Sequence, residues 1–304
     1  MERSSSAPLP MRDGVAPSRV FLPPGPWRTV LEYLESRYHH LPEGLLRRRL
    51  ARGDIVDAAG RAQGVEEPYV ANQWLWYYRE VENEPIVPFD LPVLYADDHI
   101  VVVDKPHFLA STPAGRHVRE TVLTRLRRDL SLPALSPIHR LDRETAGIMV
   151  LCAEPAHRGA YQTLFQRREV VKVYEAVAPW RGDLDFPHRH RSRMVDGYEF
   201  LMTEVAGEPN SETTVECIRV LEQGLALYRL HPTTGRKHQL RVHLSGLGMP
   251  IVHDELYPDL QPQRAADDFE RPLQLLARSL SFTDPLSGRR HQFHSQRRLA
   301  LASV

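Results

Sequence analysis

Six short runs rich in β-branched and aromatic residues follow Pro92, and they constrain the fold more than any other feature of the chain. Turn-forming residues separate these runs, and only three intervening stretches have the 3.6-residue spacing of a helix. The pattern predicts an α+β fold with a mainly antiparallel sheet. The predicted strands are Val93–Tyr95, Ile100–Val103, Gly147–Leu151, Val170–Pro179, Thr213–Leu221 and Leu225–His231. The predicted helices are Thr121–Leu130, Ala156–Arg168 and Lys237–Leu247.

A smaller unit is predicted ahead of this region. Val30, Leu31 and Leu34 have helical spacing, and Leu45–Arg52 is a strongly basic amphipathic stretch that ends at Gly53. A short apolar pair and the β-rich run 74–81 predict a small sheet packed on these helices. This order, with the sequence G-D-I-V-D-A-A-G-R, resembles the alpha-L RNA-binding domain, a small α/β module. The resemblance implies that a basic helix face follows an RNA backbone, or else is merely solvated. The face consists of Arg47, Arg48, Arg49 and Arg52.

Length and composition limit the number of domains and the class of protein. Its 304 residues, 42% of them hydrophobic, can fill one large core or two smaller ones. Residues 1–26 are rich in Ser, Pro and Arg and are expected to form a flexible leader. Prolines 85, 88 and 92 mark a linker, so the domains are predicted as 27–88 and 89–304. No apolar run resembles a signal peptide or a membrane span of about 20 residues, so we expect a cytoplasmic protein with no membrane partner.

Charge and cysteine content exclude little by themselves. Acidic and basic residues number 39 each, which by itself does not indicate a nucleic-acid partner. All but three of the basic residues are Arg, which suits contacts with phosphates and bases but also follows from a GC-rich genome. Cys152 and Cys217 are far apart and are expected to be reduced thiols.

The segment 137–151 places a carboxylate in a polar loop. Asp142 lies between Arg140 and Arg143, just before a run that is predicted to be a buried strand. An Asp in this position is by itself compatible with a turn or capping role. A functional interpretation needs partners from elsewhere in the chain.

Such partners lie in the segment 233–248. Thr233 or Thr234 is expected to cap a helix that Gly248 ends. The apolar stripe of that helix is Leu240, Leu244 and Leu247. His238 and Arg241 are three residues apart, so they share one side of the helix and could hold a carboxylate from another segment.

Several motifs appear together in a fixed order. They are His139-Arg140-Leu141-Asp142 with Thr145, Lys172-x-Tyr174-x-Ala176, and Thr234-Gly235-Arg236-x-His238-Gln239-x-Arg241-x-His243. Asp104-Lys105-Pro106 precedes them, and Pro250-Ile251-Val252-x-Asp254, Leu276-Ala277 and Phe282 follow. Over residues 93–296 the chain thereby resembles the RluA-type pseudouridine synthases. These enzymes break the bond between N1 of a uracil and its ribose, turn the base over and join C5 to the same sugar carbon, with no cofactor.

The resemblance implies a role for each matching residue. Asp142 would be the essential carboxylate, either a nucleophile on sugar or base or a proton acceptor. Arg241 would keep it ionised, and Tyr174 would stack on the uracil with its hydroxyl near C5. Arg140 would help to flip the uridine out of its stack. Site support and substrate binding would fall to His139, His238, Gln239 and Arg236.

The chain departs from the family pattern at three places. His107-Phe108 replaces a small residue and Gly in a loop that the resemblance places near the RNA, so the departure bears on which RNA is bound. Ala146 replaces a usual Ser and Lys237 a usual Thr or Ser, and neither change removes a catalytic group. We therefore expect activity.

Two histidine- or arginine-rich stretches invite further hypotheses. His188 and His190 share a strand face, but no Cys or carboxylate follows at ligand spacing, so no metal site is predicted. The stretch 187–193 is interpreted as a basic RNA-facing ribbon or an inert exposed strand. The same RNA interpretation applies to Arg289, Arg290, Arg297 and Arg298.

Two alternatives to the synthase remain. A metal-dependent phosphodiesterase would use His139, Asp142, His243, His253 and Asp254. An inactive RNA-binding or ribosome assembly factor would need only the basic N-terminal helix, and Asp142 would be structural. If the chain is a synthase, as we expect, its partner is predicted to be ribosomal RNA, and transfer RNA is the second choice. The chain is expected to be a monomer with no obligate protein partner and to need neither cofactor nor metal.

Overall fold

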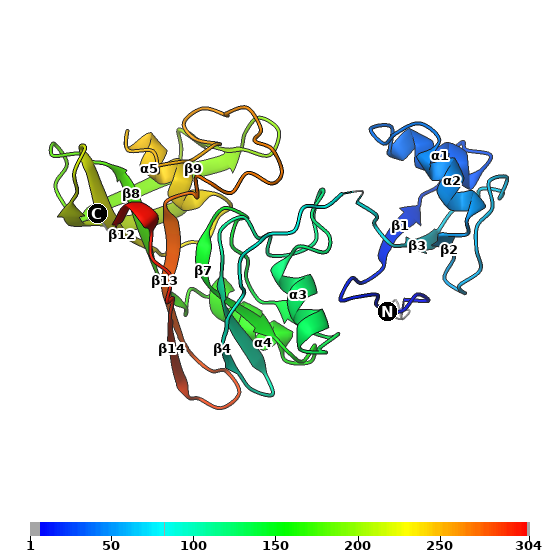
Figure 1. Ribbon diagram of the computed structural model, residues 1–304, viewed down its shortest axis with the longest axis horizontal. Helices are drawn as coiled ribbons and strands as arrows, with labels where there is room; N and C mark the ends of the chain where they lie inside the picture. The colour runs from blue at the N-terminus through cyan, green and yellow to red at the C-terminus, as the bar shows by residue number, and fades with distance from the viewer. Residues whose placement is uncertain (1–6, 82, 303–304) are drawn as a thin grey trace. The chain divides into compact units, whose positions relative to one another are not determined.

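The computed structural model describes residues 7–81 and 83–302. The chain divides into two compact units, Met1–Glu84 and Pro85–Val304, and Figure 1 labels the helices and strands of each. Within the described parts, the helices are all too short or too polar to cross a membrane.

The first unit packs two helices on a three-stranded antiparallel sheet. Its elements are β1 (Ser18–Leu22), α1 (Val30–Arg37), α2 (Leu45–Ala51), β2 (Ile55–Val56) and β3 (Gln73–Tyr77). The strand order is β1-β3-β2. Thr29 starts α1, since its hydroxyl accepts a hydrogen bond from the backbone N–H of Glu32 at 3.2 Å. Both predicted helices and the two predicted strands are present.

The expected flexible leader is wrong for its later part. Ser18–Leu22 forms β1, which pairs along its length with β3. Val20 and Leu22 are buried beneath α1, whereas Arg19 and Phe21 between them are exposed. This run of alternating residues is too short to stand out among the prolines, and it gains its stability from strand pairing and burial. Residues 1–6 of that leader lie outside the described residues.

The boundary between the units falls before the predicted one. Val87 is buried in the core of the second unit, and its N–H donates to the Glu120 carboxylate at 2.8 Å. The second unit therefore begins at Pro85 instead of residue 89.

The second unit is built around a large sheet. Its strands are β4 (Val93–Ala96), β5 (Ile100–Lys105), β6 (Ser136–Pro137), β7 (Ala146–Cys152), β8 (Val171–Pro179), β9 (His188–Asp196), β10 (Met202–Val205), β11 (Ser211–Val220), β12 (Leu225–Pro232), β13 (Leu275–Thr283) and β14 (Arg290–His294). Its helices are α3 (Val122–Asp129), α4 (Arg158–Gln166), α5 (Gln239–Gly246) and the short 3₁₀ helix η1 (Ala300–Ala302).

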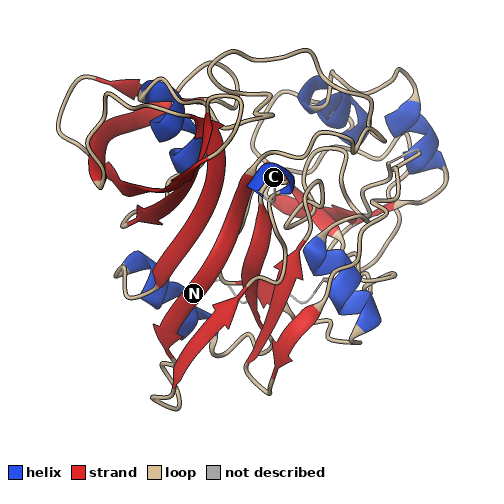
Figure 2. Cartoon of the chain, turned by 60° about the vertical axis from the view of Figure 1, so that its left-hand side comes forward, coloured by secondary structure: helices blue, strands red, loops and turns tan. Residues whose placement is uncertain are grey.

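The strand order is β10-β9-β11-β12-β8-β13-β7-β5-β4, with β14 beside β13 and β6 beside β7. Figure 2 shows the long strands side by side, in red. Among the described residues the pair β7 and β13 is parallel, and the other neighbours in this sheet are antiparallel. The predicted α+β class with a mainly antiparallel sheet is confirmed.

The central strands are buried on both faces, which explains why they read as continuous apolar runs. Val101 and Val103 of β5 pack in the same cluster as the apolar side of α3. Ile100 and Val102 point the other way and pack with α4. Farther along the sheet, α5 covers β8, β11 and β12 with Leu240 and Leu244. The helix that carries the second motif is thus fixed to the sheet by its predicted apolar stripe.

Candidate active site

A polar cavity of about 710 Å³ opens in the second unit. Its walls come from the loop before β7, from β8 and from the loop that leads into α5. The lining residues include every predicted catalytic and substrate-binding residue, namely His139, Arg140, Asp142, Tyr174, Arg236, His238, Gln239 and Arg241. Segments about a hundred residues apart in the sequence therefore meet at one site.

The loop that carries Asp142 is held by backbone contacts on both sides of that residue. Ser111 Oγ donates to the Leu141 carbonyl at 2.6 Å and accepts from the Leu141 N–H at 3.1 Å. Lys105 Nζ donates to the Arg143 carbonyl at 3.0 Å, and His107 Nδ1 lies 2.6 Å from the Glu144 carbonyl. Asp142 itself is about 30% exposed in the cavity. The backbone of the loop is thus hydrogen-bonded on both sides of Asp142, while the carboxylate lines the cavity.

Lys105 is the main support of this loop. Its fully buried Nζ reaches three carbonyl oxygens, those of Pro106, Leu109 and Arg143, at 2.7 to 3.0 Å. Three acceptors match the three donors of an ammonium group. Burial lowers the pKa of Lys105 to about 7, although the negative charges of Glu144 and Asp142 raise this pKa and so limit the shift. Lys105 belongs to a motif that the sequence singled out, but its contacts with the Asp142 loop appear only in the structure.

Arg241 lies beneath the carboxylate, on α5. Its Nη1 is 3.5 Å from Asp142 Oδ2, which is a long contact. Its principal partner is Asp254, whose two carboxylate oxygens accept from Nε at 2.8 Å and from Nη2 at 2.6 Å. Burial lowers the pKa of Arg241, but the hydrogen bonds and charge of Asp254 outweigh burial and raise it. The predicted pair of Arg241 with Asp142 is in fact a row of three groups, Asp254–Arg241–Asp142.

Tyr174 stands on β8 beside this row, and it lines the cavity. Burial raises the pKa of Tyr174, and the negative charge of Asp142 raises it further. The phenol is therefore protonated at neutral pH and is a hydrogen-bond donor in the free protein.

His139 and His238 are neutral supports. His139 Nε2 accepts from the Val150 N–H at 3.1 Å, and its ring stacks on Phe165 with centroids 4.7 Å apart. Burial lowers the pKa of His139 to about 3 and that of His238 to about 4. His238 Nδ1 lies 2.8 Å from the Tyr257 hydroxyl. The expectation that His238 and Arg241 together grip one carboxylate is not met, because each has its own partner.

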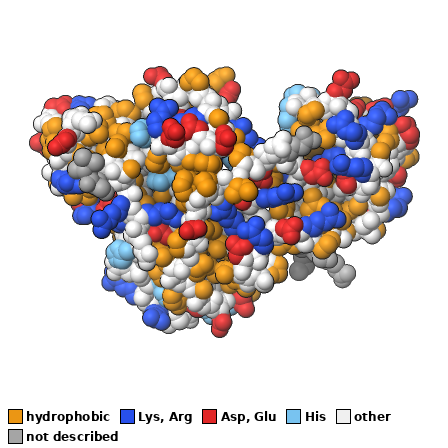
Figure 3. Space-filling view, in the orientation of Figure 1, with side chains coloured by type: hydrophobic (Ala, Val, Ile, Leu, Met, Phe, Trp, Pro, Cys, Tyr) orange, Lys and Arg blue, Asp and Glu red, His pale blue; other side chains and the backbone are white. Residues whose placement is uncertain are grey.

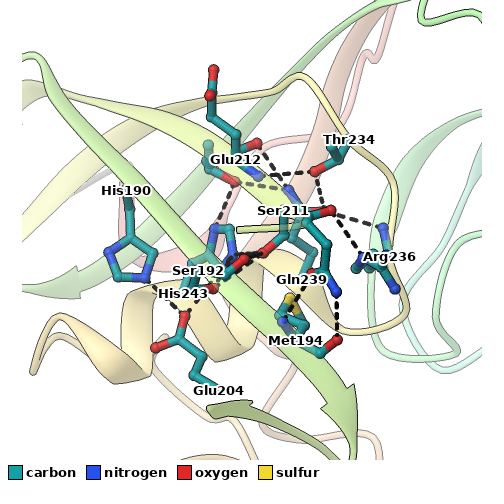
Figure 4. A network of polar contacts seen from close by, with 12 residues as sticks. His190, Ser192, Met194, Glu204, Ser211, Glu212, Thr234, Arg236, Gln239 and His243 are labelled. Atoms are coloured by element: carbon teal, nitrogen blue, oxygen red, sulfur yellow. Dashed lines mark hydrogen bonds and ion pairs between the residues drawn. The ribbon is translucent and has the colours of Figure 1, made fainter. Parts of the chain in front are cut away.

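The start of α5 also differs from its prediction. His238, with φ 55°, occupies the N-cap position in place of Thr233 or Thr234. Thr234 Oγ1 instead accepts from the Glu212 N–H at 3.0 Å and donates to Gln239 Oε1 at 2.7 Å. Gln239 Nε2 donates to the Glu212 carbonyl and to Thr213 Oγ1, both at 3.0 Å, as Figure 4 shows for this network. The Gln239 amide is thus engaged with the protein and shapes the loop 234–238.

Two arginines remain at the cavity surface. Arg236 donates from Nε to the Asn210 carbonyl at 3.0 Å, which leaves the rest of its guanidinium toward the cavity. Arg140 is exposed beside Asp142, and no described residue offers it a hydrogen bond. Lys172 also lines the cavity, with its Nζ 2.9 Å from the Thr234 carbonyl. Arg140, Arg236 and Lys172 thus bring three cationic side chains to the lining of the cavity.

The predicted basic surfaces are less uniform than the sequence implies. On α2, Arg47 and Arg48 are exposed, but Arg49 is buried and donates to the Tyr78 carbonyl. Arg52 is engaged with Asp54 and Glu80. Consecutive residues of a helix point in different directions around its axis, so a run of consecutive arginines cannot all lie on one side. On the face shown in Figure 3, Lys and Arg side chains are interspersed with Asp and Glu over both units.

The other two predicted basic regions are also partly neutralised. The stretch 187–193 does form a strand, β9, but its Arg189 and Arg191 both pair with Glu212. Near the C-terminus, Arg297 donates to the carbonyls of Asp104 and Asp90. It therefore holds the end of the chain to the sheet.

The residues of the alternative metal-dependent hydrolase do not converge. Within the described residues, the groups close enough to share a metal ion are His99, Glu154 and His157, and His190, Glu204 and His243. Neither group includes Asp142 or Asp254, and Asp254 is occupied by Arg241.

This fold and this site define the class of the RNA pseudouridine synthases. The family described as RNA pseudouridylate synthase matches residues 99–246. The dual-specificity RNA pseudouridine synthase RluA of Escherichia coli K12 is 36% identical over 219 residues, 68% of this chain and 92% of that one. An RNA pseudouridine synthase of Synechocystis, described as uncharacterized, is 30% identical over 75% of this chain and 79% of its own.

Solved structures agree. Human RNA pseudouridylate synthase domain containing 4 is 26% identical, with a TM-score of 0.53 over 69% of this chain and 90% of its own. Human RNA pseudouridylate synthase domain containing 1, 23% identical with a TM-score of 0.55, shares the fold. The chain belongs to the RluA-type pseudouridine synthase family, and it isomerises uridine to pseudouridine in RNA.

Proposed function

We propose that the substrate is a uridine of ribosomal RNA, or else of transfer RNA, and that Asp142, Tyr174 and Arg241 carry the reaction. The observation that carries this proposal is the row Asp254–Arg241–Asp142, which presents one carboxylate of a buried charge network to an open polar cavity. The name of the Escherichia coli relative describes that protein as having dual specificity. We also propose that the protein is a monomer and that it acts in the cytoplasm.

The reaction needs an ionised carboxylate. The N1 bond to the ribose breaks, the uracil turns over and C5 bonds to the same sugar carbon. C5 then gives up its proton and N1 gains one, so substrate and product are isomers. Asp142 acts in this sequence as the nucleophile or as the proton acceptor at the sugar. The Arg241 guanidinium, 3% exposed and fixed by Asp254, keeps a positive charge next to Asp142 when substrate closes the cavity to water.

Tyr174 gives the uracil a surface to lie against. Its ring is in the wall of the cavity near Asp142, where a base can stack on it. Because its hydroxyl is protonated in the free protein, Tyr174 enters the reaction as a donor, and it accepts the C5 proton only if it first passes its own to another group.

The cations of the cavity rim suit a flipped nucleotide. Chemistry on both faces of a base requires that the base leave its stack. Arg140 is free to fill the place that the uracil vacates, and Arg236 and Lys172 lie where phosphates would pass.

The test is pseudouridine mapping of ribosomal and transfer RNA from cells that lack the protein and are complemented with variants. Wild type should restore one or more sites, and Asp142→Asn should restore none while its purified form keeps the wild-type circular dichroism. Glu144→Gln is the matched control, because this carboxylate lies in the same loop but pairs with Arg143. Restoration by Asp142→Asn would refute the catalytic role, and sites outside both RNAs would refute the substrate.

A further inference from the structure

Three side chains that the reaction does not use converge on the far side of α5. His190 comes from β9, Glu204 from β10 and His243 from α5, and Figure 4 shows the first two turned toward the third. His190 Nε2 lies 2.8 Å from Glu204 Oε1, and His243 Nε2 lies 4.0 Å from the same oxygen. The three donor atoms all fall within 4.8 Å of one another.

This spacing is close to that of a metal site. Zinc binds imidazole nitrogen at about 2.0 to 2.1 Å and carboxylate oxygen at about 2.0 to 2.2 Å, so its ligand atoms are roughly 3 to 4 Å apart. Rotations of the His190 and Glu204 side chains, which are 16% and 25% exposed, would equalise the three distances. Two imidazoles and one carboxylate select a first-row transition cation over calcium or magnesium, which prefer oxygen ligands.

The surroundings of His243 are those of a fixed ligand. The ring is wholly buried, and its Nδ1 lies 2.9 Å from Thr213 Oγ1. A metal-bound histidine normally has such a partner on its second nitrogen, which sets the direction of the first. The Nε2 atom points to Ser192 and Ser211 at 3.2 and 2.9 Å, on the side where Glu204 lies. Ser211 Oγ already donates to the Ser192 carbonyl at 2.8 Å, so a water molecule would take the fourth position.

The backbone also makes room for the carboxylate. Gly246 on α5 faces Glu204, and a Cβ at this glycine would lie 2.5 Å from Glu204 Oε2. The absence of a side chain at position 246 therefore lets the carboxylate approach α5 and its histidine.

We propose that His190, Glu204 and His243 bind one Zn²⁺ ion, or a similar divalent transition-metal ion, that ties the β9–β10 hairpin to α5. The site is structural, because α5 presents Arg241 to the cavity while His243 faces this hairpin. The sequence motifs did not indicate it, since the nearest pair of ligands is separated by fourteen residues and a turn. The proposal is independent of the RNA substrate.

The test uses the full-length protein, freed of metal by chelator, with Zn²⁺ alone as the probe in titration calorimetry. Wild type should bind Zn²⁺ at this site and unfold at a higher temperature with the metal, since a ligand that binds only the folded state stabilises it. His190→Ala and Glu204→Gln should each weaken this binding by more than about 100-fold, beyond the usual cost of losing an outer-shell partner. Both residues are partly exposed, so these variants should fold even if His243→Ala does not.

Two controls separate this site from its neighbours. His188→Ala changes a histidine of the same strand that is not among the three donors, and it should bind Zn²⁺ like wild type. The variant His99→Ala/His157→Ala removes the second group of candidate ligands and should also keep the site. Equal binding by wild type, His190→Ala and Glu204→Gln would overturn the proposal, as would loss of all binding in the His99/His157 variant or no binding by wild type.

Discussion

Asp254 is the residue on which the position of Arg241 depends. Its side chain is 1% exposed, and besides the two bonds to Arg241 its Oδ1 accepts from the N–H groups of Leu256 and Tyr257 at 2.8 and 3.2 Å. A carboxylate fixed by its own backbone can orient a guanidinium by two parallel bonds. Asp254 thus acts through Arg241 and is a positioning residue.

We expect Asp254→Asn to lower kcat by about 100-fold, as a misplacement of roughly 1 Å in an active site does, while KM for RNA changes little. The variant should also be less stable by about 3 to 5 kcal/mol, because a buried guanidinium loses its counter-charge. Single-turnover kinetics and urea unfolding measure the two effects. Glu255→Gln removes the neighbouring carboxylate, which pairs with Arg264 instead, and should leave kcat unchanged. A normal kcat in Asp254→Asn would contradict the positioning role.

Phe108 shows how a side chain compensates for an unfavourable backbone. It has φ 66°, in the left-handed region where the family usually has Gly. Its ring is 2% exposed and packs with Phe89 and Phe269, at centroid distances of 6.2 and 5.4 Å. The departure that the sequence placed near the RNA is therefore also a core contact that anchors the loop next to Lys105.

Phe108→Gly should destabilise the second unit. Glycine removes a backbone strain of about 1 to 2 kcal/mol, but burial of a phenyl ring is worth about 3 to 5 kcal/mol. The free energy of unfolding should fall by about 2 kcal/mol, as measured by urea denaturation. A variant more stable than wild type would show that the strain outweighs the packing.

At the scale of elements, the junction of β7 with β13 decides whether the sheet closes behind the Asp142 loop. Gly147, with φ 113°, pairs with Ala277 in the parallel register of these strands. A Cβ at position 147 would lie 2.2 Å from the Ala277 carbonyl oxygen. Only glycine fits both the dihedral angle and the close approach.

Gly147→Ala should therefore abolish soluble expression or activity, because β13 must move away from β7, the strand that follows the Asp142 loop. Gly159→Ala is the matched control, since Gly159 lies in α4 and a Cβ there meets nothing within 4 Å. That change should leave the protein at least as stable as wild type, because alanine loses less backbone freedom than glycine on folding. Soluble yield and pseudouridine formation test Gly147→Ala, and thermal unfolding tests Gly159→Ala. A stable, active Gly147→Ala protein would refute the account of this junction.

For the whole molecule, buried neutral histidines link stability to pH. Burial lowers the pKa of His139 to about 3, and that of His107 and of His238 to about 4. In the unfolded chain each pKa is about 6.5. Between these values the unfolded chain binds more protons than the folded one, so stability is complete above pH 6.5 and is lost as pH falls toward 4.

We expect the second unit to lose about 1 to 2 kcal/mol per histidine between pH 7.5 and pH 5. Urea unfolding followed by far-ultraviolet circular dichroism would report this loss. The first unit holds none of these three histidines but does hold Trp27, Trp74 and Trp76, whereas Trp180 lies in the second unit. In a Trp180→Phe background, tryptophan fluorescence therefore reports the first unit alone and provides an internal control that should shift less. Equal shifts in both signals would contradict an origin in the buried histidines.

Local patterns in the sequence were enough for most regular elements of the second unit. The runs of β5 and β7 were visible because burial on both faces makes consecutive residues apolar. The stripe of α5 was visible because burial on one side of a helix repeats apolar residues at i, i+3, i+4 and i+7. Strands β6, β10, β13 and β14 were not predicted, and β1 was mistaken for leader. In β13 the apolar residues are interrupted by Arg278, Ser279 and Ser281. Strands β13 and β1 depend on partners distant in the sequence, since β13 pairs with β7 and β8 and β1 pairs with β3.

The sequence by itself determined the family, the α+β class and the identity of the groups in the cavity, because ordered motifs specify chemistry without a structure. Tertiary structure decided the contacts of those groups. Arg241 pairs mainly with Asp254 and lies 3.5 Å from Asp142, and Arg49 is buried. His190 and Glu204 lie next to His243. A periodic pattern reports on neighbours within a few residues along one element. Contacts between elements, such as the one across 99 residues from Asp142 to Arg241, follow only from how the sheet and α5 pack.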